Sequence, residues 1–205
     1  NSMSIAAPAT NPASDLSLKL PATIGTAGQY LTVDGSGNLV WADPPGITYV
    51  DCWRITADQT SSQNPISSDW ERCDTTENGF TQGFIGTGMS ESSGVFTFPA
   101  TGIWLVKFQA NSSTQDQEEY FENIIAMSGD SGSSWENMAY GYGNHYDDSN
   151  ATWATATTWT TVDVTNTSTQ KVSFKVYFPT GANDKTLGST NDNHTHALFI
   201  RLAGT

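Results

Sequence analysis

Charged residues are scarce in this chain, and basic residues are the scarcest. Only 14% of the 205 residues are charged, with eight Lys and Arg against 21 Asp and Glu, so the formal net charge is −13. Nucleic-acid binding requires clustered basic side chains, and an anionic membrane surface repels so acidic a protein. The composition therefore excludes nucleic acid as a partner. It is typical of proteins that stay soluble in salt water, where ions screen self-repulsion.

Long hydrophobic runs are also absent. No stretch approaches the roughly 18 apolar residues of a membrane-spanning helix, and no signal-peptide pattern opens the chain. We therefore predict no membrane insertion. Asn1-Ser2-Met3 is typical of a cloning remnant, so we expect the chain to be a piece of a longer protein.

Cysteine is nearly absent, with only Cys52 and Cys73 in the chain. The two lie close enough in sequence for a disulfide, but two buried thiols fit equally well. Sequence does not supply the Cβ geometry that a bridge requires. The pair is therefore a disulfide candidate that remains open at this point.

Residues that carry catalysis are few. The histidines are His145, His194 and His196, and no G-x-S-x-G, H-E-x-x-H, Walker or Rossmann pattern occurs. The acidic pairs at 118–119 and 147–148 lie in polar loop-like sequence, where carboxylates are ordinarily solvated surface groups. We predict that the protein is not an enzyme.

What the sequence has in abundance is alternation with a period of two. Along residues 103–110, one face carries Trp104, Val106, Phe108 and Ala110, and the other carries Ile103, Leu105, Lys107 and Gln109. This pattern predicts a β-strand. Similar runs predict strands at 49–55, 66–72, 81–86, 95–98, 120–127, 135–142, 151–164, 171–178 and 194–202. Short strands at this spacing, without a 3.6-residue period, predict an all-β sandwich.

Residues 1–46 are predicted to form an N-terminal linker and a neck, and residues 47–205 a head. Residues 25–43 predict a short hairpin that turns at Gly35-Ser36-Gly37-Asn38, and Pro44-Pro45-Gly46 marks the boundary. Because a lone hairpin is marginal in water, we expect copies from other chains to complete it. The side chains expected between chains are Leu16, Leu18, Leu20, Leu31 and Trp41.

Two stretches of the head resemble the C1q/TNF-like jelly rolls. Gly94, Phe96, Pro99, Gly102, Ile103 and Trp104 match their central motif, in which one strand ends at a Pro and a Gly-aromatic pair opens the next. Residues 197–202 resemble their closing strand. The resemblance implies a jelly-roll β-sandwich and a homotrimer whose aromatic inner faces pack on a threefold axis.

The neck resembles a motif frequent in phage tail-fibre proteins, G-T-x-G-Q-x-L-x-x-D-G-x-G-x-L-x-W. The matching residues are Gly25, Thr26, Gly28, Gln29, Leu31, Asp34, Gly35, Gly37, Leu39 and Trp41. Such segments form trimeric shafts or necks ahead of a globular tip. Together the resemblances imply the receptor-binding tip of a tail fibre, on the virion and outside cells. A structural trimerisation cap and a secreted bacterial C1q-like adhesion module remain alternatives.

Aromatic and short polar side chains are concentrated in residues 128–155, which we predict to form receptor-binding loops. Aromatic rings stack on sugars, and small polar groups hydrogen-bond hydroxyls, so a host glycan is the expected receptor. The candidate receptor-binding residues are Trp135, Tyr142, His145, Tyr146, Asp147, Asp148 and Trp153. Packing within strands is the alternative for Trp135, Tyr140 and Trp153.

Two kinds of metal site are candidates. His194 and His196 share a strand face, and three copies around a threefold axis would present six imidazoles to an octahedral transition metal. Fibre shafts of some phages resemble this, with H-x-H motifs that hold iron. The loops at 130–132, 147–150 and 191–193 offer oxygen ligands of the kind that calcium requires. An exposed strand end and solvated turns are the respective alternatives.

Overall fold

The computed structural model describes residues 19–42, 46–114, 120–146, 151–179 and 183–204. The chain separates into two compact units, Asn1–Gly46 and Ile47–Thr205. Within the described residues there is no helix, and hence none long and apolar enough to cross a membrane. The fold is all-β, as the alternation predicts.

The first unit contains a β-hairpin. β1 (Tyr30–Val33) pairs antiparallel with β2 (Leu39–Ala42). In the turn, the side-chain amide of Asn38 and the backbone N–H groups of Asn38 and Ser36 donate to the Asp34 carboxylate at 2.9 to 3.0 Å. These bonds to its charged form lower the pKa of Asp34. The predicted hairpin is confirmed, and its role as a trimeric neck stays a prediction.

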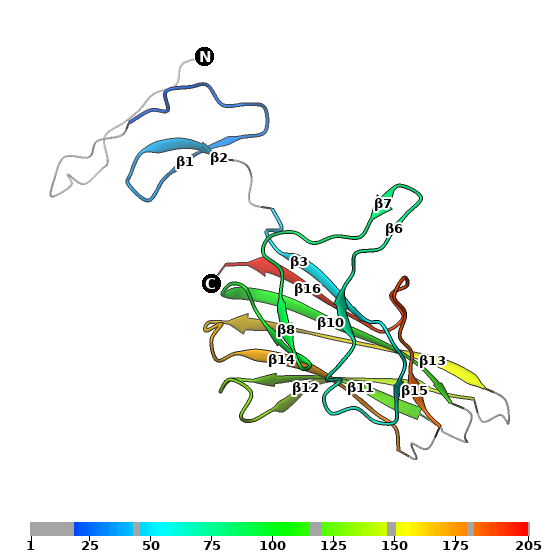
Figure 1. The fold of residues 1–205 in the computed structure, drawn as a ribbon. Helices are drawn as coiled ribbons and strands as arrows, with labels where there is room; N and C mark the ends of the chain where they lie inside the picture. Colours follow the sequence, from blue (N-terminus) through cyan, green and yellow to red (C-terminus); the bar gives the residue numbers. More distant parts are fainter. Residues whose placement is uncertain (1–18, 43–45, 115–119, 147–150, 180–182, 205) are drawn as a thin grey trace. The chain divides into compact units, whose positions relative to one another are not determined.

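The long strand β10 (Gly102–Thr114) organises the larger, seven-stranded sheet of the second unit (Figure 1). Along one edge it pairs with β13 (Thr152–Val164) over its whole length. Along the other edge it pairs with β16 (His196–Ala203) and then with β15 (Lys185–Thr186). The outer strands are β3 (Val50–Ile55) and β5 (Trp70–Arg72) beyond β16, and β4 (Gln59–Thr60) beyond β15.

The second sheet of this unit has five strands. In order they are β12 (Glu136–Asn144), β11 (Tyr120–Ser128), β14 (Lys171–Tyr177), β9 (Val95–Thr97) and β8 (Ser90–Ser92). A small hairpin, here called the arm, consists of β6 (Thr76–Glu77) and β7 (Phe80–Thr81) and projects from the sandwich (Figure 1).

The core lies between the two sheets and is built largely from aromatic rings. Trp104, Val106, Phe108 and Ala110 all point into it, so the predicted alternation of this strand is confirmed. Phe96 lies at its centre, with ring centroids 5.1 Å from Trp70 and 5.4 Å from both Phe174 and Phe199. Edge-to-face and tilted contacts at these distances stabilise beyond the burial of area.

Two predicted strands differ from the structure. The strand predicted at 66–72 begins only at Trp70, because Ile66 instead donates its N–H to the carbonyl of Phe174 in the other sheet, at 2.9 Å. Of the strand predicted at 81–86, only Thr81 lies in a strand, as the last residue of the arm, and the rest forms a single isolated bridge between Ile85 and Val50. Asn78-Gly79 closes that arm with positive φ at both residues, and an Asn-Gly pair is the strongest short hairpin signal that a sequence carries.

We expect Phe96→Ala to lower the free energy of unfolding by about 3–5 kcal/mol, because truncation leaves a cavity among four aromatic rings. Urea denaturation followed by tryptophan fluorescence measures the loss. Phe80→Ala is the matched control, since Phe80 on the arm is 83% exposed and should cost about 0.5 kcal/mol or less. Equal losses from both variants would contradict the central role of Phe96.

Candidate functional site

The outer face of the seven-stranded sheet carries an apolar surface, here called the apolar face. The register places Leu198 between Lys107 and Cys52, and the next row along the strands carries Leu105, Ile200 and Val50. All members are half-buried or exposed, although all but Trp159 project from inner strands of the sheet. They are Val50, Cys52, Ile103, Leu105, Trp159, Leu198 and Ile200.

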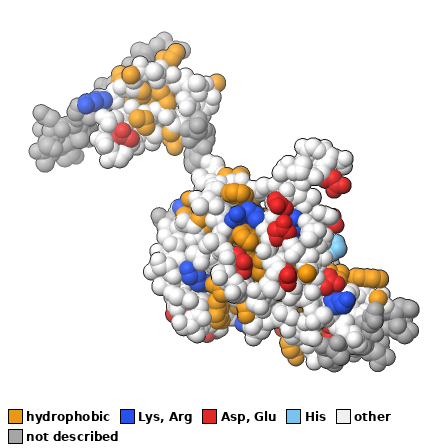
Figure 2. All heavy atoms as spheres, viewed as in Figure 1, with side chains coloured by type: hydrophobic (Ala, Val, Ile, Leu, Met, Phe, Trp, Pro, Cys, Tyr) orange, Lys and Arg blue, Asp and Glu red, His pale blue; other side chains and the backbone are white. Residues whose placement is uncertain are grey.

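Two tryptophans stand on the edge strand of this face. Trp153 is 70% exposed and Trp159 is 63% exposed, both on β13. Figure 2 shows hydrophobic atoms reaching the surface of this unit among charged side chains in the view drawn. Large apolar side chains gathered on one open sheet face are typical of a surface that contacts another protein.

The predicted receptor residues do not form one loop cluster. Tyr142 lies on β12 and points out from the five-stranded sheet, whereas Trp153 lies on β13 and points out from the other sheet. They therefore face opposite sides of the sandwich. Trp135 precedes β12, is half-buried and donates its indole N–H to the carbonyl of Gly132 at 3.0 Å. Most of the expected loop is strand, because the alternation of both segments continues through it.

The remaining candidates divide between surface and interior. Tyr146 follows β12 and is exposed, but only 7% of His145 is exposed. Nε2 of His145 lies 2.8 Å from Oγ of Ser112, and its ring packs beside Phe121. His145 is therefore largely buried, and its contact with a receptor stays a prediction. Asp147 and Asp148 lie outside the described residues.

Four tyrosines share the outer face of the five-stranded sheet. We call this surface the tyrosine face; it comprises Tyr120, Glu122, Tyr140, Tyr142, Lys175 and Tyr177. Only its members on β12 lie in residues 128–155, the stretch predicted to bind a receptor. Those on β11 and β14 are distant in sequence, and only the strand register brings them together. The alternation of both segments was the available signal.

A shallow hollow of about 320 Å³ opens on the tyrosine face. It is lined by Glu122, Ile124, Tyr140, Lys175 and Tyr177 of the sheet and by residues 62–64. Lys175 Nζ donates to Oδ1 of Asn137 at 2.9 Å, and Nδ2 of Asn137 donates to the hydroxyl of Tyr140 at 2.7 Å. Aromatic, acidic and basic groups thus surround one small space.

The two cysteines are free thiols that face each other. Cys73 follows β5 and donates its N–H to the carbonyl of Cys52 on β3 at 2.9 Å, and the sulfur atoms lie 2.8 Å apart. The hydrogen bond between the thiols raises the pKa of Cys52 and lowers that of Cys73. The pair lies at the edge of the apolar face.

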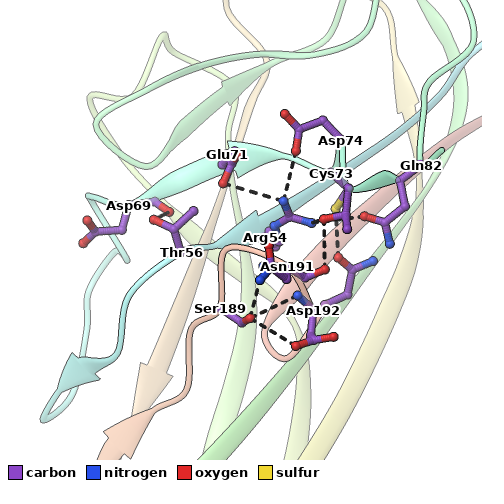
Figure 3. A network of polar contacts seen from close by, with 12 residues as sticks. Arg54, Thr56, Asp69, Glu71, Cys73, Asp74, Gln82, Ser189, Asn191 and Asp192 are labelled. Carbon is purple, nitrogen blue, oxygen red and sulfur yellow. Dashed lines mark hydrogen bonds and ion pairs between the residues drawn. The ribbon is translucent and has the colours of Figure 1, made fainter. Parts of the chain in front are cut away.

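A buried guanidinium fixes the base of the arm. Arg54 is fully buried and donates to Thr75 Oγ1 at 2.8 Å, Gln82 Oε1 at 3.1 Å and Asp74 Oδ1 at 3.0 Å (Figure 3). Because a buried cation requires such partners, these bonds hold both ends of the arm against the sheet. The hydroxyl of Thr75 in turn donates to the carbonyl of Asn191 at 2.9 Å, which extends the network to the loop before β16.

The oxygen-rich loops use their own backbone and hydroxyl groups as partners. The hydroxyl and N–H of Ser134 and the hydroxyl of Ser128 donate to Asp130 at 2.7 to 2.9 Å, which lowers the pKa of Asp130 to about 2. Ser189 Oγ accepts the N–H groups of Asn191 and Asp192 (Figure 3). Such bonds are those of closed turns, and calcium in these loops stays a prediction.

The histidine pair is split between a loop and a strand. His196 opens β16 on the outer side of the seven-stranded sheet, and His194 precedes the strand. In the part of the chain that the structure describes, no group of three or more His, Cys, Asp and Glu is arranged to hold a metal. A transition metal shared by three copies stays a prediction.

No protein-family model matches the chain, and no curated protein matches it either. Solved structures do. A structure of Eiger TNF from S. frugiperda superposes with a TM-score of 0.53 at 10% identity, covering 76% of this chain and 93% of that one. Murine APRIL at pH 5.0 gives 0.51 at 12% identity, covering 75% and 98%.

This likeness shows the fold. The head is a TNF-like jelly roll, and the predicted fold class is confirmed.

We expect the stability of the parent protein to fall as the pH drops below about 6.5, the usual value for His. Burial, and then the charge of Lys107, lower the pKa of His196, so the unfolded chain binds its proton more readily. The neutral form therefore contributes stability that is present above that pH. His196→Gln should flatten the melting temperature between pH 7 and pH 5.

Lys107→Gln is the companion variant and should flatten the same profile only in part, because the burial of His196 still lowers its pKa. An unchanged profile in His196→Gln would show that another group causes the acid sensitivity.

Proposed function

We propose that the chain is the receptor-binding tip of a phage tail fibre, which attaches as a homotrimer to the surface of a host cell. The TNF-like jelly roll and the tail-fibre motif of residues 25–41 support this together. The observation that carries the proposal is the apolar face. An open sheet face that exposes two tryptophans and a row of aliphatic side chains is typical of a surface that binds another protein.

A second copy of the same chain is the partner that we propose for the apolar face. A closed ring of identical subunits covers such a surface on every member, and three copies form the ring that the family resemblance implies. Each large side chain buried in this way stabilises the assembly by about 1.5–3 kcal/mol.

The neck supports association independently. Leu20, Leu31 and Trp41 of the first unit are all exposed. The indole N–H of Trp41 donates to the carbonyl of Thr23 at 2.8 Å, so its ring is oriented but still accessible. A short hairpin that leaves these side chains in solvent is expected to order fully only beside other copies. Leu16 and Leu18 lie outside the described residues.

The receptor is proposed to be a host glycan, bound on the aromatic surface that includes Tyr142 and Tyr146. Rigid aromatic side chains among small polar ones suit sugar rings and hydroxyls. Three copies on one fibre tip convert weak single sites into strong attachment, provided that the receptors can be reached together.

We expect light scattering coupled to size exclusion to give about 66 kDa, three times the 22.0 kDa of one chain. Leu198→Glu places a charge in the middle of the apolar face and should shift the protein to monomer. Tyr177→Glu on the opposite sheet face is the control and should remain trimeric. A parent protein near 22 kDa at micromolar concentration would overturn the proposed assembly.

We expect the double variant Tyr142→Ala, Tyr146→Ala to lose most binding to host cells while its mass and melting temperature stay those of the parent. Both rings are exposed, so their removal leaves no cavity. Flow cytometry with labelled protein measures the binding. Phe80→Ala, which removes an equally exposed ring from the arm, should bind normally. Parent-like binding by the double variant would place the receptor site elsewhere.

A further inference from the structure

We propose that the hollow of the tyrosine face binds a zwitterionic substituent of a surface glycan. Its ammonium group lies over Glu122 beside Tyr177, with Tyr142 on the neighbouring strand just outside the hollow, and its phosphate or carboxylate lies at Lys175. The inference rests on the proposed receptor-binding function and names the chemical class of the receptor. It uses residues of β11 and β14 that no sequence motif marks.

The strand register creates the ammonium end of the site. Glu122 on β11 is paired with Tyr142 on one neighbouring strand and with Tyr177 on the other, so a carboxylate stands between two phenol rings. Tyr120 packs against Tyr142 at 6.2 Å and supports that ring. Aromatic faces beside a carboxylate attract cations, and quaternary ammonium groups most distinctively.

The Glu122 carboxylate has no structural role among the described residues. Its side chain is half-buried, and its carboxylate forms no hydrogen bond or ion pair with any residue that the structure describes. Its carboxylate oxygens are not among the buried unpartnered atoms, so a cation arriving from solvent can reach them. Among the charged groups of the tyrosine face, the Glu122 carboxylate is therefore the one most available to a cationic ligand.

The anion end lies one row further along the strands. Lys175 is paired with Ile124, the next outward residue after Glu122 on the same strand. Its ammonium is held by Asn137 at 2.9 Å and makes no ion pair with a described carboxylate. Since a lysine ammonium has three donors, two are left for the oxygens of an anion.

The spacing of the two charges suits one small group. Adjacent strands and a step of two residues separate the Cα atoms of Glu122 and Lys175 by roughly 8 Å. The hollow between them, about 320 Å³, is lined by both residues and lies in the size range of small-ligand sites. A group that carries both charges a few bonds apart therefore contacts both residues at once.

The net charge of the protein further restricts the charge that the ligand can carry. With a net charge of −13, the field around the chain repels a purely anionic ligand and favours one that brings its own cation. The zwitterion is thus preferred over a phosphate or an acidic sugar. A simple amine lacks the group that Lys175 would hold.

Isothermal titration of the 205-residue protein with phosphocholine tests the proposal, with choline and inorganic phosphate as single-charge probes. We expect phosphocholine to bind at least about tenfold more tightly than either probe. Glucosamine 6-phosphate tests whether an amino-sugar phosphate serves equally well, and binding of either zwitterion supports the proposal. Binding only to phosphatidylcholine vesicles, and to neither soluble zwitterion, would overturn it in favour of a membrane surface.

Matched variants locate the site. Glu122→Gln and Lys175→Met keep the size of each side chain and should each weaken phosphocholine binding about tenfold or more. Glu136→Gln and Lys185→Met, which lie outside the hollow, should leave it unchanged. Equal effects of site and control variants would reject the tyrosine face, and far-UV circular dichroism confirms that each variant is folded.

Cell binding separates this inference from the proposed function. If the parent binds host cells but no soluble zwitterion, the ligand class is wrong and the receptor-binding function stands. If it binds neither, both proposals fail. Loss of cell binding in Glu122→Gln, with the trimer intact, supports both.

Discussion

Double-sided pairing of one strand is the constraint on which the jelly roll depends. β10 forms backbone hydrogen bonds with β13 along one edge and with β16 and β15 along the other, so it fixes the register of most of the larger sheet. The period of two then assigns every side chain to the core or the outside. A slip of one residue would put Trp104 and Phe108 into solvent and Lys107 into the aromatic core.

In the folded head, two of the few basic residues have structural roles. Arg54 holds the arm against the sheet through its hydrogen bonds. Arg72 forms an ion pair with the buried Asp51 at 2.8 Å. Its guanidinium group also stacks on the rings of Trp53 and Phe84. Both guanidinium groups therefore serve the fold beside the apolar face. The net charge of −13 makes separate molecules repel one another, which opposes non-specific association through the exposed tryptophans.

Local patterns predicted the fold well, because alternation and turn residues are properties of neighbouring positions. The strand around Trp104 and the neck hairpin followed directly from them. The extent of β12 was harder to foresee, since Gly141 and Gly143 suggest a loop but lie directly against the interior, where Phe121 leaves no space for a Cβ at Gly143. The tyrosine face could not be predicted, because Glu122, Tyr142 and Tyr177 meet only through the register of three strands.

Placing the apolar face and the tyrosine face on opposite sides of one sandwich has an evolutionary consequence. Under the proposed function, substitutions on the outer side of β11, β12 and β14 would change what the head recognises without touching the residues proposed to hold copies together. The proposed host range could then diversify while the proposed oligomer is conserved. For the same reason, this sheet face is a natural position for grafting new specificities onto an unchanged jelly-roll scaffold.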